Sequence, residues 1–543
     1  MMQPSPASVH QLLVHIAGRV PDNDLFVMPR RLVEQWSLTR ERYGYRDTVV
    51  EIDRIAERYR RAGYGHGHRV ALLAENRPVF FFHYLALNAV GASVVPVNPD
   101  YTADELRFLL AHSECSLVVA IESRMQMVAG LANELRIPLA SCAARSFPAA
   151  LRPRRDEPIT EDTECALLYT SGTTSRPKGC LITNGYMLGW SEWYLAQRGF
   201  IDLEFGVERL LQPLPTFHIN GIGNSFMGML AAGGAQVLID RFHPRSWWQE
   251  AIETGATCFH YLGVMPAMLL NLPPSSHDRA HTLRYGMGGG VHPSHHEPFE
   301  ARFGVPLLEG WAMTETGGGG ILCAMDEPRH RGMRCIGRPS RAGPPVEIRV
   351  VDDTGHDVAP DTAGELLVRA KGADPRRRFF SGYFKDADAT AAIWAGDWLH
   401  TGDVVRQSAD GSVFFLDRKK NIIRRAGENI AAIEVESALA THAAVHQCAV
   451  IPADDPIRGE EVLAAVVPAA GMVPDHLLAE TLFNHCRRSL AYYKLPGYIV
   501  FVGQLPTTST QKIRKHDLRP LAERPNDHPQ CHDLRTLKQR AHR

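Results

Sequence analysis

A run rich in hydroxyl groups and glycine is the part of this sequence whose residue types most directly suggest chemistry. Residues 169–179 read Tyr-Thr-Ser-Gly-Thr-Thr-Ser-Arg-Pro-Lys-Gly, and they follow the apolar residues 166–168, where we expect a strand to end. Clustered hydroxyls, the backbone donors around Gly172 and the positive charge of Lys178 together suit a polyphosphate. The run is not a Walker A loop, because the pattern G-x-x-x-x-G-K-[ST] is missing. The alternative is a surface turn rich in serine and threonine.

Shorter motifs follow this run along the chain. They are Leu-Pro-Thr-Phe-His at 214–218, Gly-Gly-Gly at 288–290, Gly-Trp-Ala-Met-Thr-Glu at 310–315, Trp-Leu-His-Thr-Gly-Asp at 398–403, Asp-Arg-Lys-Lys at 417–420, Gly-Glu-Asn at 427–429 and Pro-Thr-Thr-Ser-Thr-Gln-Lys-Ile-Arg at 506–514. Together with the run at 169–179 they resemble, in the same order, the signatures of the adenylate-forming superfamily of acyl-CoA synthetases, luciferases and adenylation domains. The resemblance extends from about residue 40 to residue 520.

The resemblance implies activation of a small carboxylic acid by Mg-ATP, giving an acyl-adenylate that then passes to coenzyme A. The residue types suit this reaction, because attack of a carboxylate on the α-phosphorus of ATP brings two anions together and needs neutralised charge and alignment. By resemblance, Lys512 is the catalytic cation between carboxylate and α-phosphate, Thr314 donates to that phosphate, and Glu315 holds Mg²⁺. Two positions depart from the family pattern, since Gln511 and Ala312 each stand where glycine is usual.

The resemblance also assigns residues that bind the nucleotide and coenzyme A. The expected phosphate-binding residues are Thr170, Ser171, Gly172, Thr173, Thr174 and Lys178; those at the adenine are Gly288, Gly289, Gly290, Gly310 and Trp311; those at the ribose are Asp403 and Arg418; and those on the pantetheine path are Gly427, Glu428 and Asn429. Ordinary structural roles are the alternatives for several of them: Glu315 at a helix start, Asp403 in a turn and Trp311 in the core. For Lys512 the alternative is a solvated lysine on a polar loop.

His218, by the same resemblance, lies between the acyl pocket and the coenzyme A channel, and a buried structural histidine is the alternative. The expected lining of the acyl pocket is Ile219, Asn220, Gly223, Tyr261, Leu262, Gly263 and Gly288. This set contains no lysine or arginine, so we expect a neutral or mildly polar acyl group. Lys420 matches the hinge about which the family's C-terminal domain turns between the two half-reactions.

The elements that must position these residues form an alternation of short β-branched runs and helical stretches. Such runs lie at 70–73, 117–120, 236–239 and 306–308. The alternation predicts an α/β fold, with a large N-terminal domain of doubly wound sheets over 1–417 and a small β-rich subdomain at about 330–417. A small mobile α+β C-terminal lid domain should cover 418–520, and the polar residues 521–543 should form a disordered tail.

The composition excludes several other classes of protein. The net charge of −1 over 543 residues predicts no broad surface for nucleic acid or anionic membrane. Ten cysteines without a C-x-x-C pair indicate a reducing compartment, and residues 1–20 lack the pattern of a signal peptide, so we expect a cytoplasmic protein. Residues 79–97 are apolar but carry His83 and Asn88 and break at Gly91, which predicts a buried helix and strand rather than an integral membrane segment. Monomer and homodimer are both open.

Within the superfamily the sequence resembles carnitine/crotonobetaine-CoA ligases in particular. Residues 175–176, Ser-Arg, and residues 273–279, Pro-Pro-Ser-Ser-His-Asp-Arg, carry this similarity. A trimethylammonium acyl group would require an aromatic or acidic cage, for which Tyr261 and Trp311 are candidates. Two other functions stay open. One is an adenylating enzyme that passes its adenylate to an amine or activates another oxyanion such as nitrite, and the other is a non-catalytic binding protein of the same fold.

Overall fold

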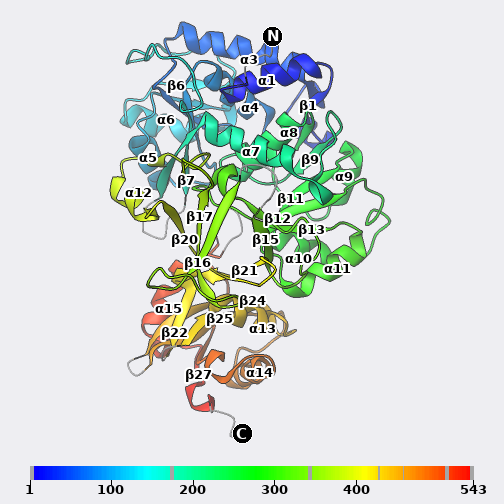
Figure 1. Cartoon of the computed structure of the whole chain (residues 1–543), viewed down its shortest axis with the longest axis vertical. Helices are drawn as coiled ribbons and strands as arrows, with labels where there is room; N and C mark the ends of the chain where they lie inside the picture. The colour runs from blue at the N-terminus through cyan, green and yellow to red at the C-terminus, as the bar shows by residue number, and fades with distance from the viewer. Residues whose placement is uncertain are drawn as a thin grey trace.

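The protein is known from a computed structural model. It describes residues 5–170, 177–339, 345–425, 428–455, 458–507 and 513–538. A large N-terminal part holds two sheets and a smaller C-terminal part holds a third, and the two parts lie end to end along the long axis (Figure 1). No helix in the described ranges is long and apolar enough to span a membrane.

The first sheet has seven strands among the described residues. Its order is β18 (Gly382–Tyr383), β8 (Lys178–Thr183), β7 (Glu164–Thr170), β4 (Ser93–Pro96), β3 (Arg69–Leu73), β5 (Leu117–Ala120) and β6 (Leu139–Ser141). The strands from β7 to β6 are parallel, and β4 and β5 are buried along their whole length, as expected for parallel strands covered on both faces. The prediction for residues 79–97 is confirmed, because the helix α4 (Pro78–Ala89) leads into β4.

The second sheet has fourteen strands in the described part of the chain. Its order is β16 (Val346–Val351), β17 (Ala363–Ala370), β20 (Trp398–Gln407), β21 (Val413–Arg418), β15 (Cys335–Pro339), β14 (Leu322–Cys323), β13 (Leu307–Trp311), β12 (Tyr285–Gly289), β11 (Cys258–Leu262), β9 (Arg209–Gln212), β10 (Ala235–Leu238), β1 (Asp24–Val27) and β2 (Arg42–Gly44), with β19 (Trp394–Ala395) paired to β20. From β1 to β13 the strands are parallel, and from β13 to β16 they are antiparallel. The parallel half therefore ends at β13, where the antiparallel strands of residues 322–418 begin.

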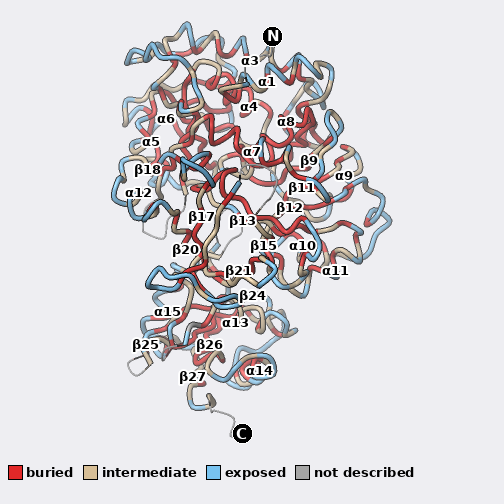
Figure 2. The backbone as a smooth tube through the Cα atoms, in the orientation of Figure 1, coloured by how far each residue is buried: buried red, intermediate tan, exposed pale blue. Residues whose placement is uncertain are grey.

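One hydrophobic core joins these two sheets, and the helix α7 (Asn184–Ala196) belongs to it. This helix is buried on nearly every side, which explains why it is apolar all round rather than amphipathic. Figure 2 shows the same distribution, with buried residues concentrated inside the N-terminal part and exposed residues on its outer helices and loops. The site described below therefore stands on a rigid, closely packed base.

The C-terminal part has its own core and a sheet of six strands among the described residues. Its strands are β23 (Glu428–Ala431), β22 (Ile422–Arg425), β25 (Gly459–Pro468), β26 (Tyr498–Phe501) and β27 (Cys531–Asp533), with β24 (Val445–Asp455) paired to β25. The helices α13 (Ala432–Ala440) and α14 (His476–Cys486) contribute buried residues to its core. β21 ends at Arg418 in the large sheet and β22 begins at Ile422 in this one, so the chain passes from one sheet to the other between these residues; the domain bounds at 417 and 418 stay a prediction.

The prediction of a disordered tail over 521–543 is wrong for residues 521–538. This segment continues the helix α15 (Arg519–Glu523) and forms β27, which pairs antiparallel with β26. Leu534 is fully buried in the core, and Arg535 forms an ion pair with the buried Asp455 over 3.2 Å. The ion pair of Arg535 and the burial of Leu534 thus fix the position of a segment whose composition is polar. Residues 539–543 lie outside the described ranges.

Candidate active site

Three of the predicted motifs lie at the carboxyl ends of parallel strands in the large sheet. The strands β9, β11, β12 and β13 are parallel, so their carboxyl ends lie at the same edge. The motif at 214–218 follows the end of β9, the glycines at 288–290 end β12, and the motif at 310–315 begins at the end of β13. In open α/β sheets, ligands bind in the crevice outside the carboxyl ends of the strands. The fold therefore brings these three motifs to one place.

The glycines of this edge are required by the close approach of neighbouring strands. A Cβ atom at Gly288 would lie 2.2 Å from the carbonyl oxygen of Tyr261, and one at Gly289 would lie 2.9 Å from that of Gly310. Gly290 has a φ of +81°, in the left-handed region that favours glycine. The result is a surface of bare backbone, which a flat base can approach closely.

Trp311 and Asp403 form a buried pair beside these glycines. Trp311, at the end of β13, donates its indole Nε1–H to Oδ2 of Asp403 over 2.7 Å. Asp403 on β20 lies opposite Arg418 on β21, whose Nε is 2.8 Å from Oδ1. Burial raises the pKa of the Asp403 carboxyl, while Arg418 and Trp311 oppose that shift. Because a carboxylate has about four acceptor positions, Asp403 can still accept from the two hydroxyls of a ribose.

Glu315 is fixed by hydrogen bonds in the turn after β13. Its Oε1 accepts from the hydroxyl of Tyr383 over 2.7 Å, and its backbone oxygen accepts from the N–H of Phe380 over 3.1 Å. The hydroxyl of Tyr186 donates to the backbone oxygen of Thr314 over 2.7 Å. No described residue donates to Oε2 of Glu315. A largely buried carboxylate with one oxygen held and the other free is a fitting ligand for Mg²⁺.

Lys178 and Glu315 both lie close to Tyr383. Thr170 and Lys178 face each other at the ends of β7 and β8, which form an antiparallel pair. The ammonium of Lys178 lies 3.7 Å from Oδ2 of Asp386 and 4.8 Å from the centre of the Tyr383 ring. Tyr383 therefore connects the end of the hydroxyl-rich run to Glu315. The remaining predicted phosphate-binding residues, Ser171, Gly172, Thr173 and Thr174, lie outside the described residues.

His218 is exposed at the same edge, so the alternative of a buried structural histidine is not observed. Its ring lies 4.8 Å from the ring of Phe217, centre to centre. The next residues form a π-helix, η3 (Asn220–Ser225), a rare conformation that is frequent at functional sites. His218 and the start of this π-helix are thus placed together, outside the end of β9.

A buried chain of hydrogen-bonded side chains holds Asn220 in place. Oδ1 of Asn220 lies 2.8 Å from Nδ1 of His260, and Nε2 of His260 lies 2.6 Å from the hydroxyl of Tyr194. Burial lowers the pKa of His260 to about 3, so the ring is neutral near pH 7. With Oδ1 facing Nδ1, the single ring proton lies on Nδ1 and Tyr194 donates to Nε2. The amide nitrogen of Asn220 donates to no described residue, which leaves it available to a ligand.

The hinge region and the C-terminal part meet through polar contacts. Oδ2 of Asp417 accepts from the N–H of Ile433 over 2.9 Å, and Arg334 donates to Oγ of Ser437 over 2.9 Å. Glu428 is exposed at the start of β23. The side chains of Lys420 and Asn429, and all of Gly427 and Lys512, lie outside the described residues, so the roles assigned to them stay predictions.

Four side chains that contribute to this site are missing from the sequence-based set. Tyr383 holds Glu315, and His260 with Tyr194 holds Asn220. Glu309 lies directly before the 310–315 motif, and burial raises the pKa of its carboxyl to about 7, although the N–H groups of residues 290 and 291 oppose the shift. Of these residues, only Glu309 lies directly beside a motif, so it is the only one that the position of a motif could have pointed to.

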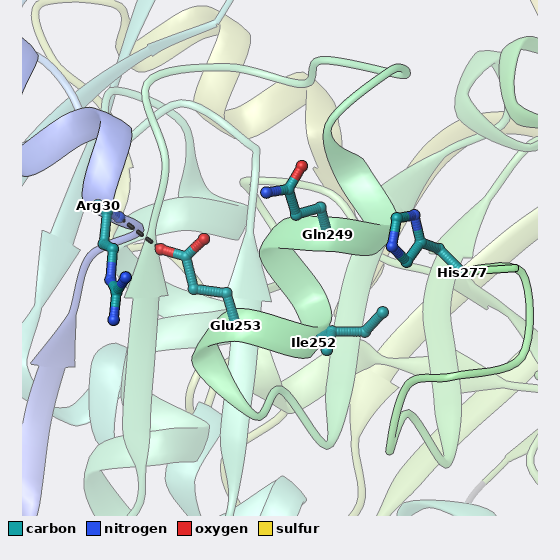
Figure 3. Close-up of a pocket in the computed structure, with 5 residues that line it drawn as sticks. All are labelled: Arg30, Gln249, Ile252, Glu253 and His277. Atoms are coloured by element: carbon teal, nitrogen blue, oxygen red, sulfur yellow. Dashed lines mark hydrogen bonds between the residues drawn. The ribbon is translucent and has the colours of Figure 1, made fainter.

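A surface hollow of about 330 Å³ lies elsewhere, along the helix α9 (Trp247–Thr254) (Figure 3). Its lining residues are Arg30, Gln249, Ile252, Glu253 and His277. The backbone N–H of Arg30 donates to Oε1 of Glu253 over 2.6 Å, so this carboxylate serves the start of the helix α2 (Arg30–Gln35). The hollow shares no residue with the site at the sheet edge, and we assign it no catalytic role.

Comparisons with known proteins agree with this arrangement. Residues 19–384 match the AMP-binding enzyme family, and residues 434–512 match the AMP-binding enzyme C-terminal domain. A crotonobetaine/carnitine–CoA ligase of Shigella flexneri is 32% identical over 496 residues, which cover 88% of this chain and 93% of that protein. ATP-bound MatB from Rhodopseudomonas palustris has a TM-score of 0.78 at 22% identity, covering 98% of this chain and 100% of that one. The amide bond synthetase McbA from Marinactinospora thermotolerans has a TM-score of 0.78 at 23% identity, covering 95% and 100%.

The family match covers well over half of the chain, and the ligase relative exceeds 30% identity over most of it. The two solved structures share the fold at lower identity, and they support the architecture alone. The predicted resemblance to the superfamily and the predicted α/β fold with a separate C-terminal domain are therefore confirmed. This chain belongs to the AMP-binding enzyme family and is an adenylate-forming enzyme.

Proposed function

We propose that the protein uses Mg-ATP to convert a small carboxylic acid with an uncharged acyl group into an acyl-adenylate, and then transfers the acyl group to coenzyme A. The observation that carries the first step is the convergence of Trp311, Asp403 and Glu315 at one sheet edge, with Lys178 joined to Glu315 through Tyr383. Only a ligand with a base, a ribose and phosphates would use all of these groups at once.

The nucleotide would lie along this edge. The bare backbone at Gly288, Gly289 and Gly290 suits the adenine, with Trp311 beside it, and Asp403 suits the ribose hydroxyls. Glu315 would hold Mg²⁺, which shields the phosphate charges when it is bound. Lys178 and the hydroxyl-rich run would hold the outer phosphates. Each group thus faces the part of ATP that matches its chemistry.

In the first step, an oxygen of the substrate carboxylate attacks the α-phosphorus, and the bond to pyrophosphate breaks. Lys512, as the family resemblance implies, would neutralise the charge that the two anions bring together. Thr314 would donate to the α-phosphate, since its backbone is held by Tyr186 in the turn beside Glu315. Alignment of the two reactants supplies the remaining acceleration.

The acyl pocket favours an uncharged acyl group over a trimethylammonium group. Tyr261 is only 1% exposed and donates its hydroxyl to the backbone of Leu308 over 3.3 Å, so its ring belongs to the core. The indole of Trp311 is held by its hydrogen bond to Asp403. A quaternary ammonium needs an accessible ring face within about 6 Å. His260, which holds Asn220, is neutral and offers no positive charge to pair with an anionic acyl group.

The second step requires the C-terminal part to turn. Its contacts with the N-terminal part include the polar ones at Asp417 and Arg334, and polar interfaces between domains permit relative motion. A turn about Lys420 would withdraw Lys512 and bring the residues around Glu428 to the pantetheine path. His218, exposed at the edge, would then lie between the acyl group and the thiol.

The decisive experiment measures pyrophosphate release over a library of carboxylic acids, with and without coenzyme A. Acid-dependent release with thioester formation supports the full proposal. Release that needs no coenzyme A and yields an amide, or that follows another oxyanion such as nitrite, replaces the second step with a different acceptor or substrate. Exchange of pyrophosphate into ATP that stays at background for every acid would support a non-catalytic binding protein.

A further inference from the structure

A fully buried carboxylate in the C-terminal part is held by two cations from opposite ends of its sequence. Glu461, at the start of β25, is 0% exposed. Nε of Arg425 lies 2.9 Å from both of its carboxylate oxygens, and Nζ of Lys538 lies 2.6 Å from Oε1. We call these three residues the buried triad. Because burying an unpaired charge is strongly unfavourable, each member depends on the others.

Lys538 reaches the triad through an ordered C-terminal segment, residues 531–538. Its first residues form β27 on the edge of the sheet, and Arg535 pairs with Asp455 over 3.2 Å. Nζ of Lys538 also donates to the backbone oxygen of Tyr493 over 3.1 Å. The segment is therefore held at two successive places, β27 and Arg535, before the ammonium of Lys538 enters the interior.

Arg425 links the buried triad to the hairpin that β22 and β23 form. It is the last residue of β22, and it lies opposite Glu428 on β23 and opposite Gly459 on β25. Its guanidinium is thus one of the contacts that join this hairpin to the centre of the sheet, together with the hydrogen bond that the N–H of Arg424 donates to Oε2 of Glu460 over 2.6 Å. Nε of Arg425 contacts both carboxylate oxygens of Glu461, and hydrogen bonds between charged groups are stronger than those between neutral ones.

We propose that the C-terminal segment 531–538, through Lys538 and the buried triad, positions the β22–β23 hairpin for the coenzyme A half-reaction. The inference rests on the proposed function, in which residues around Glu428 serve the pantetheine path. Lys538 is a positioning residue, because it touches Glu461 and not a substrate. Thr507 and Ile513, the described residues on either side of Lys512, form a β-bridge with each other and are not part of the buried triad, so adenylate formation should not depend on this arrangement.

Replacing Lys538 by methionine tests the proposal, because it removes the charge and keeps an apolar side chain of similar length. Lys494→Met is the matched control: Lys494 pairs with Glu434 over 2.7 Å in the same domain, at a more exposed position. Lys538→Met should slow thioester formation by about ten- to a hundredfold, as expected for a misplaced reacting group. Pyrophosphate release without coenzyme A should stay within about twofold, and Lys494→Met should change neither rate.

Hydrogen exchange supplies a readout that is independent of activity. In Lys538→Met, peptides from 422–431 should exchange faster than in the wild type, while peptides from β25 and β26 keep their protection. If Lys538→Met unfolds the whole domain, Arg535→Gln tests the proposal instead, with the same measurements of thioester formation and hydrogen exchange. This change should be milder, because Arg535 is partly exposed and Asp455 keeps an ion pair with Arg458 at 3.7 Å.

Three results would overturn the proposal: unchanged exchange in the hairpin of a folded variant, a loosened hairpin with a normal rate of thioester formation, or equal loss of both half-reactions. Wild-type protein that forms adenylate but no thioester would instead contradict the proposed second step. The two failures are therefore distinguishable, since one concerns the variant and the other the wild type.

Discussion

Replacing Trp311 by phenylalanine should weaken ATP binding through the carboxylate of Asp403. The change keeps an aromatic face but removes the indole N–H, which lies 2.7 Å from Oδ2 of the fully buried Asp403. A hydrogen bond to a charged group contributes about 1.5–3 kcal/mol. Since about 1.4 kcal/mol corresponds to a factor of ten, KM for ATP should rise by roughly ten- to a hundredfold.

The nature of the loss is as informative as its size. The other oxygen of Asp403 keeps Arg418 at 2.8 Å, so the carboxylate should rotate rather than leave. A rotated carboxylate gains less from a second ribose hydroxyl, and the preference for ATP over 2′-deoxy-ATP should fall. The assay is pyrophosphate release at saturating acid, with KM measured for both nucleotides. KM for the acid should not change.

Trp398→Phe serves as the control, because Trp398 begins the same strand as Asp403 and its ring contacts Arg369 instead. Both variants should keep the wild-type circular dichroism spectrum and melting temperature within a few degrees. If Trp311→Phe is folded and leaves KM for both nucleotides at wild-type values, the reasoning about Asp403 and the ribose is refuted.

Three further predictions concern the phosphates, the metal and the buried carboxyl of Glu309. Lys512→Ala should lower pyrophosphate release by at least about a hundredfold and spare thioester formation from supplied acyl-adenylate; equal loss of both steps contradicts its assigned role. Tyr383→Phe frees Oε1 of Glu315 and should raise the Mg²⁺ concentration for half-maximal activity by about tenfold, in a titration at fixed ATP. Burial raises the pKa of Glu309 to about 7, so its folded carboxyl holds a proton that the unfolded chain has released, and wild-type stability falls as pH rises from about 4.5 to 7. Glu309→Gln should therefore gain up to about 3 kcal/mol relative to wild type between pH 5 and pH 8 in urea unfolding, and a difference that does not vary with pH would contradict this.

The convergence of motifs at one sheet edge could be predicted from the sequence. Each of the three motifs at this edge lies at or just after the end of a short strand, and parallel strands place their carboxyl ends together. The glycines at 288–290 could be anticipated for the same reason, because only residues without a side chain permit strands and ligand to approach closely. Local patterns of this kind depend on neighbours along the chain, which the sequence displays directly.

The hydrogen bonds that hold the site together could not be predicted in this way. Trp311 and Asp403 are 92 residues apart, Tyr383 and Glu315 are 68 apart, and Tyr194 and His260 are 66 apart. Each pair forms because two elements pack in one particular register, and that register is set by the whole core. A tyrosine that holds a metal-binding carboxylate and one that fills a core look alike until their partners are known.

The C-terminal segment shows how such partners could still be sought. Asp455 and Glu461 lie in or beside apolar strands of the C-terminal sheet, and both are almost completely buried. An acidic residue in that position is unstable unless a cation accompanies it into the interior. The sequence therefore shows that cations are needed, although it does not show which ones. The polar segment after residue 520 supplies two of them, Arg535 and Lys538, which is why composition alone predicted disorder where the charges in fact impose order.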